Sequence, residues 1–337
     1  METLWFCLVA ILIAGYVVLD GFDLGAGIIH LGVARNDQER TQVLKSIGPF
    51  WDGNEVWLLA GGGTLYFAFP ALYSSSFSGF YLPLMMVLWL LILRGISIEF
   101  RNHIDSPTWK PLWDVVFCGA SALLAIFYGA ALGNVVRGVP LDRAGDFFLP
   151  LWTDFQLSSE PGILDWYTIL VGLLAFFTLT VHGAWWVRYK TAGEVARRSA
   201  HIGGLAWWAT ALLTAMVTFA SFRIQPQIAI NFGSYPWGIV FPTLAVAGLV
   251  GAKFLKSERN AFLSSCAYII GMLTSCVFGV YPNVLPSNTT AAHSLTIYNA
   301  SAPGYGLGVG LVWWLPGMAL ASAYAFFLYR RFAGKVS

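Results

Sequence analysis

Two pairs of acidic residues lie within strongly apolar stretches of the sequence. The first pair, Asp20 and Asp23, occupies the run Val-Leu-Asp-Gly-Phe-Asp-Leu-Gly-Ala-Gly. A spacing of three residues puts both carboxylates on one face of a helix. Charged side chains inside a membrane are costly and usually functional. We interpret this pair as a buried polar site or an element of a proton relay. The alternative is a structural pair that bonds to a neighbouring helix.

The second pair, Asp52 and Glu55, has the same spacing in the run Pro-Phe-Trp-Asp-Gly-Asn-Glu-Val-Trp. A carboxylate at the cytoplasmic start of a helix could take up protons and pass them inward. The alternative is a capping cluster at the membrane surface. We place Glu55 and the adjacent Asn54 with the buried polar site, and we assign Asp52 to proton uptake.

One basic residue, Arg94, ends another apolar stretch, and Glu99 and Arg101 follow it. Arg94 could pair with one of the acids, or it could extend its side chain to the membrane surface.

The histidines and cysteines do not form a ligand pattern. Of the five histidines, only His182 lies well inside an apolar stretch, so we expect no haem site in this chain. The four cysteines lie in apolar runs without a CxxC motif, so we expect no metal site.

The composition indicates the elements that must position these residues. Only 11% of the 337 residues are charged and 57% are hydrophobic, whereas soluble domains carry about 25% charge. A span needs about 20 apolar residues. We predict an all-α polytopic membrane protein whose nine helices form two four-helix bundles plus one peripheral helix. All of residues 1–337 belong to one membrane domain, with helices at about 4–33, 47–73, 76–98, 112–136, 163–188, 202–223, 237–256, 260–281 and 307–330.

The basic residues predict the orientation of these spans. With nine helices, 16 of the 19 Lys and Arg residues fall on one side. Cytoplasmic loops are rich in basic residues, so we expect the N-terminus outside and the C-terminus in the cytoplasm. The net charge of +2 gives no indication of a nucleic-acid partner, and we expect none.

The motifs resemble subunit II of the cytochrome bd-type quinol oxidases along nearly the whole chain. The segments that carry the resemblance are Asp20-Gly-Phe-Asp23-Leu-Gly, Arg35-Asn-Asp-x-Glu-Arg40, Trp51-Asp52-Gly-Asn54-x-Val-Trp57, Phe77-Ser-Gly-Phe80-Tyr, Arg94-x-x-x-x-Glu99-x-Arg101 and Gly133-Asn134. The Trp-Asp-Gly-Asn block is the most specific of these.

The resemblance implies a haem-free subunit that supports assembly and proton supply. Its partner, subunit I, would hold two b-type haems and one haem d, oxidise quinol, and reduce O2 to water without pumping protons. Small single-helix subunits and a structural quinone occur in some relatives. The complex would lie in a bacterial or archaeal cytoplasmic membrane.

The resemblance also suggests roles for individual residues. It implies a cytoplasmic proton pathway through Asp52, Arg94 and Glu99, although many relatives have Asp at the position of Glu99. Asp20 and Asp23 match a family motif and fit a buried polar site. The alternative function is a proton-coupled secondary transporter. Such transporters often have helices broken at matching places in two halves, and the prolines show no matched pair.

Overall fold

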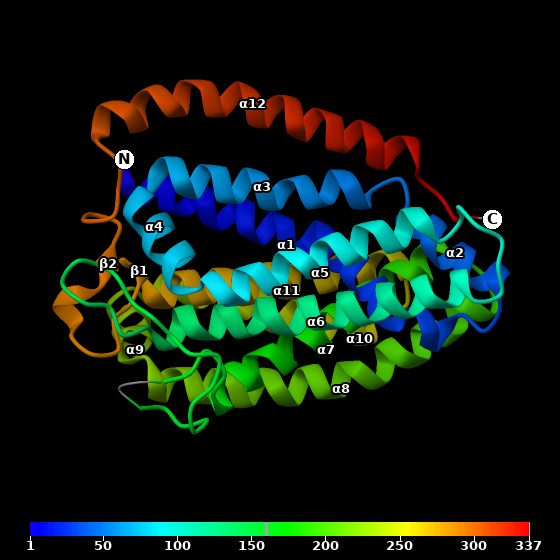
Figure 1. Cartoon of the computed structure of the whole chain (residues 1–337), viewed down its shortest axis with the longest axis horizontal. Helices are drawn as coiled ribbons and strands as arrows, with labels where there is room; N and C mark the ends of the chain where they lie inside the picture. The colour runs from blue at the N-terminus through cyan, green and yellow to red at the C-terminus, as the bar shows by residue number, and fades with distance from the viewer. Residues whose placement is uncertain (159–160, 337) are drawn as a thin grey trace.

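The computed structural model describes residues 1–158 and 161–336. Long helices run side by side along the molecule (Figure 1). Within the described residues, eight helices are long and apolar enough to cross a membrane. They are α1 (Glu2–Val33), α5 (Tyr81–Phe100), α6 (Trp109–Arg137), α7 (Trp166–Lys190), α8 (Gly193–Ile224), α10 (Val240–Phe254) with the preceding η1 (Pro236–Ile239), α11 (Glu258–Val280) and α12 (Gly304–Arg331).

A ninth span forms only if two bent helices are counted together. α3 (Trp51–Ala68) and α4 (Pro70–Gly79) meet at an angle of 119°. Pro70 lacks a backbone N–H and disfavours the helical conformation in the residue before it. Accordingly, Phe69 has φ −133° and ψ 66°. The prediction of one continuous span over 47–73 was therefore wrong, as was a third span beginning at 76, because residues 76–79 belong to α4.

Two further helices are too short to span. α2 (Asp37–Ile47) links α1 to α3, and α9 (Pro226–Ser234) follows α8. The side chain of Asn36 caps α2 by accepting from the backbone N–H of Glu39 at 2.9 Å.

Four of the spans, α1, α3, α5 and α6, precede α7, and both α1 and α6 pack against α7. The division of the spans into two four-helix groups stays a prediction. α12 lies at the periphery (Figure 1). Where α1 meets α7, a Cβ on Gly25 would lie 2.6 Å from the backbone nitrogen of Gly183. Only glycine permits this backbone approach.

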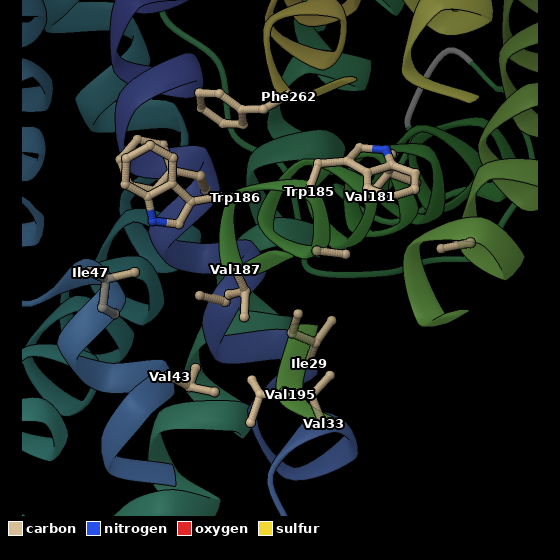
Figure 2. Packing of buried hydrophobic residues seen from close by; sticks show 14 of the residues in the cluster. Ile29, Val33, Val43, Ile47, Val181, Trp185, Trp186, Val187, Val195 and Phe262 are labelled. Carbon is tan, nitrogen blue, oxygen red and sulfur yellow. The ribbon is translucent and has the colours of Figure 1, made fainter. Parts of the chain in front are cut away.

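The largest buried apolar cluster fills this junction near α2. It draws side chains from α1, α2, α7, α8 and α11. Figure 2 shows part of it, in which residues distant in sequence pack together; the labelled side chains are Ile29, Val33, Val43, Ile47, Val181, Trp185, Trp186, Val187, Val195 and Phe262. This packing fixes the face that α1 turns toward α3 and α5.

The two ends of the bundle differ. One end, which we call the hairpin end, carries β1 (Asn283–Leu285) paired with β2 (Leu295–Thr296), with η2 (Ala291–His293) between them. The N-terminus lies at this end (Figure 1). The opposite end, which we call the α2 end, carries α2 and the C-terminus (Figure 1).

Candidate functional site

A buried ion pair joins α1 to α5 near the α2 end. Arg94 donates through Nη1 to Oδ2 of Asp20 at 2.9 Å, and through Nη2 to the other carboxylate oxygen. Both side chains are fully buried. Such two-pronged pairing is the strongest geometry for an arginine and a carboxylate. Glu55 of α3 lies 3.9 Å from Arg94 Nη1, and a quarter of its side chain is exposed.

The second acid of α1, Asp23, bonds to α3 instead. Asn54 Nδ2 donates to Asp23 Oδ2 at 2.7 Å and to the backbone carbonyl of Leu19 at 3.1 Å. Asn54 Oδ1 accepts from the hydroxyl of Tyr329 on α12 at 2.9 Å. The second oxygen of Asp23, Oδ1, is buried without a partner in the described part of the chain.

The helical spacing explains why these residues meet. Asp20 and Asp23 share one face of α1, and this face lies toward α3 and α5. Phe22 points the other way and stacks on Trp186 of α7 at 4.0 Å between ring centroids. Asp20, Asp23, Asn54, Glu55 and Arg94 are called the Arg94 cluster below.

The Arg94 cluster has more acids than bases. Among the described residues, Arg94 is the only cation within ion-pair distance of any of these acids, and it reaches Asp20 and Glu55 but not Asp23. If Asp20, Asp23 and Glu55 were all ionised, the cluster would carry a net charge of −2 in a low-dielectric region. Because burying uncompensated charge is very costly, this arrangement favours at least one bound proton.

The structure does not bring the three pathway residues into contact. Arg94 is fully buried, whereas Asp52 and Glu99 are exposed on the surface of the isolated chain. Asp52 lies one turn before Glu55 on α3. Glu99 lies five residues after Arg94 on α5, a spacing that turns it away from the face of Arg94.

A second ionic cluster lies at the α2 end, and sequence reasoning missed its centre, Asp114. This carboxylate accepts from His30 Nε2 at 2.7 Å, Arg101 Nε at 2.6 Å and Arg40 Nη1 at 3.0 Å. Arg101 also donates to Asp37 at 2.6 Å. An acid in the apolar stretch that begins α6 was the available signal. The Asp114 network is defined as His30, Asp37, Arg40, Arg101, Asp105, Lys110 and Asp114.

The pKa values of two acids outside the spans agree with their ion pairs. The hydrogen bond from Arg101 holds the pKa of Asp37 on α2 below its usual value. The backbone N–H of Arg35, together with the Arg198 side chain, likewise lowers the pKa of Glu39.

The only histidine predicted to lie well inside a span has hydrogen-bond partners at both ring nitrogens. His182 Nδ1 bonds to the hydroxyl of Ser265 at 2.7 Å, and Nε2 bonds to the carbonyl of Val18 at 2.9 Å. With both ring nitrogens engaged, His182 does not fit the role of an axial haem ligand.

Comparison with known proteins identifies the family. Residues 1–332 match the family described as cytochrome bd terminal oxidase subunit II. The chain belongs to this family. It is 30% identical over 364 residues to a probable cytochrome oxidase subunit 2 of Haemophilus influenzae, covering 100% of this chain and 95% of the relative. It is 27% identical over 346 residues to the cytochrome bd ubiquinol oxidase subunit 2 of Bacillus subtilis, covering 98% and 96%.

A solved structure matches the fold. The bd oxidase of Geobacillus thermodenitrificans contains a chain that superimposes with a TM-score of 0.75 at 19% identity, covering 98% of each chain.

Family membership confirms the expected resemblance and places the chain in a quinol:O2 oxidoreductase complex of a bacterial respiratory membrane. Such a complex implies a subunit I partner that carries the haems. These matches do not support the transporter alternative.

Proposed function

We propose that this chain is the haem-free subunit II, which supplies protons from the cytoplasm to haems in subunit I and supports assembly. The observation that carries this proposal is the excess of acids over bases in the Arg94 cluster. A buried cluster that needs a bound proton for charge balance can also exchange one. Quinol oxidation and O2 reduction are assigned to subunit I.

The distribution of basic residues supports a position of this cluster near the cytoplasm. The helix ends and loops toward the α2 end, together with the C-terminal segment, carry 16 of the 19 basic residues. By the positive-inside rule the α2 end is cytoplasmic and the hairpin end is outside. Protons then meet Asp52 first, reach Glu55 one turn deeper, and arrive at the Asp20–Arg94 pair.

The exposed acids also indicate where subunit I docks. Within their most apolar windows, 61% of α7 residues are buried, against 11% for α5 and none for α12. Asp52 and Glu99 are exposed on α3 and α5, and Glu55 is partly exposed. Because carboxylates do not face lipid at low cost, we assign the surface of α3, α5 and α12 to the contact with subunit I.

Neutral variants of the uptake residues test this function in the purified complex. Asp52→Asn and Glu55→Gln should slow O2 reduction and proton uptake about a hundredfold, the low end of what proton-transfer groups contribute. Their haem spectra should match the wild type, because neither substitution removes a cation from a buried pair.

A matched control is Glu194→Gln, which changes an exposed acid on α8 that pairs only with its neighbour Arg197. It should leave both rates unchanged. Normal proton uptake by Asp52→Asn and Glu55→Gln in the assembled complex would contradict the proposal. Loss of the haem spectrum would instead show that these acids act in assembly.

A further inference from the structure

A chain of three hydrogen-bonded side chains connects the peripheral helix to the Arg94 cluster. Tyr329 on α12 donates to Asn54 on α3 at 2.9 Å, and Asn54 donates to Asp23 on α1 at 2.7 Å. The residues lie 275 and 31 positions apart in sequence. The cluster therefore includes a contact from a helix that is otherwise barely packed against the chain.

The direction of these bonds is set by the groups around Asn54. Its amide nitrogen faces two acceptors, the carboxylate of Asp23 and the carbonyl of Leu19. Its amide oxygen faces the hydroxyl of Tyr329. Rotating the amide by half a turn would set its oxygen against the Leu19 carbonyl, which has no proton to donate. The two acceptors thus hold the donor side of Asn54 toward Asp23, and the hydroxyl of Tyr329 pairs the amide oxygen on the opposite side.

The position of Tyr329 depends on the contacts that hold α12 against the rest of the bundle. Its ring stacks on Phe50 at 4.7 Å between centroids. Just beyond α12, the carbonyl of Phe332 accepts from Lys190 Nζ at 2.6 Å. At the other end of α12, the carbonyl of Leu307 accepts from the Trp5 indole at 3.2 Å. Between these attachments, residues 319–324 are exposed on every face of the helix.

From this geometry we propose that Tyr329 is a positioning residue for the proton site. By donating to the amide oxygen of Asn54, it polarises the amide and strengthens the hydrogen bond that Asn54 donates to Asp23, so that the seating of α12 tunes the charge of the Arg94 cluster. A hydrogen bond donated to a carboxylate favours its charged form. This inference rests on the proposed role of the cluster in proton supply.

Other charged and titratable groups also surround Asp23, besides the amide of Asn54. Asp20 and Glu55 are the other acids of the cluster, and Arg94 is its cation. On α7, His182 is held by Val18 and Ser265, and on α11 Cys266 lies near Tyr329. Among the described residues, none of these groups bonds to the amide oxygen of Asn54, so the pairing of that oxygen comes from Tyr329.

The test is Tyr329→Phe in the whole complex, with Tyr324→Phe as the control. The Phe substitution at 329 keeps the ring and removes the hydroxyl. Tyr324 is an exposed tyrosine on the same helix. For Tyr329→Phe, the pH profile of O2 reduction should shift to higher pH. The infrared carbonyl band of protonated Asp23, which is assigned by its loss in Asp23→Asn, should persist to higher pH. The expected shift is less than about one pH unit, because the hydrogen bond from Asn54 to the charged form is weakened rather than removed.

A second variant covers the case in which Tyr329→Phe fails to assemble. Asn54→Ala removes the amide that donates to Asp23 while the sequence of α12 stays unchanged, and it should shift the same band in the same direction. A band and a pH profile that match Tyr324→Phe would overturn the inference. If Glu55→Gln and Asp52→Asn slow proton uptake while Tyr329→Phe shifts nothing, the inference fails alone. If Asp52→Asn and Glu55→Gln leave proton uptake unchanged but Tyr329→Phe shifts the pH profile, the proton-supply proposal fails instead.

Discussion

Two ionic clusters lie near the same end of the bundle, and they differ in their balance of charge. The Asp114 network contains three acids and the three cations Arg40, Arg101 and Lys110, with His30 beside them. The Arg94 cluster contains three acids and one cation. Both are centred on buried arginine–carboxylate pairs, so burial alone does not distinguish them.

This difference separates a structural role from a proton-exchanging one. In the Asp114 network, hydrogen bonds and opposite charges compensate the central carboxylate, and a proton added there would cost several bonds. In the Arg94 cluster, Asp23 and Glu55 lack a cation of their own. A proton added there relieves repulsion. We therefore assign proton exchange to the Arg94 cluster and the stabilisation of helix packing to the Asp114 network.

The largest expected effect comes from neutralising the central acid of each cluster. Asp114→Asn leaves the buried Arg101 and the partly exposed Arg40 without their shared carboxylate and should destabilise the chain by about 3–5 kcal/mol. Asp23→Asn removes surplus negative charge and should change stability by less than about 1 kcal/mol. Thermal unfolding of the complex compares the two. Equal losses would remove the distinction between the clusters.

A smaller effect is expected for Arg101, one of the three cations of the Asp114 network. Arg101→Gln removes the bonds to Asp114 and Asp37, but His30 and Arg40 still contact Asp114. The expected cost is about 1–3 kcal/mol. O2 reduction per assembled haem should be unchanged. A fall in that rate with intact haem spectra would assign proton transfer to this network as well.

The smallest expected effect concerns pH and Asp37. Because Arg101 lowers the pKa of this half-exposed side chain, its ion pair stabilises the fold at pH values above the ordinary pKa of Asp, about 4. That stabilisation is lost as the pH falls through the lower folded value. Asp37→Asn should therefore cost less than about 1 kcal/mol at neutral pH and low salt. The difference from wild type should vanish near pH 2, and a difference that persists there would contradict the pairing.

Much of the fold could be predicted because its signals are local. The apolar stretches predicted the spans, and the alternation of basic loops predicted their number. The break at Phe69–Pro70 was also encoded locally, but a long apolar run concealed it. Within the site, the spacing of Asp20 and Asp23 predicted their common face.

The remaining contacts depend on helix packing that no local pattern encodes. Tyr329 meets Asn54 across 275 positions, and Asp114 meets His30 across 84. Glu99 was grouped with Arg94 by family resemblance, whereas the turn of α5 separates the two side chains. The roles of Asp52, Arg94 and Glu99 stay predictions.

The most direct test of the account is whether the Arg94 cluster holds a proton at neutral pH. Infrared spectroscopy of the assembled complex detects the carbonyl band of a protonated carboxylic acid. We predict such a band in the wild type. The double variant Asp23→Asn/Glu55→Gln should lose the band while its haem spectra stay unchanged. A wild-type band that the double variant leaves intact, or the absence of any band, would contradict it.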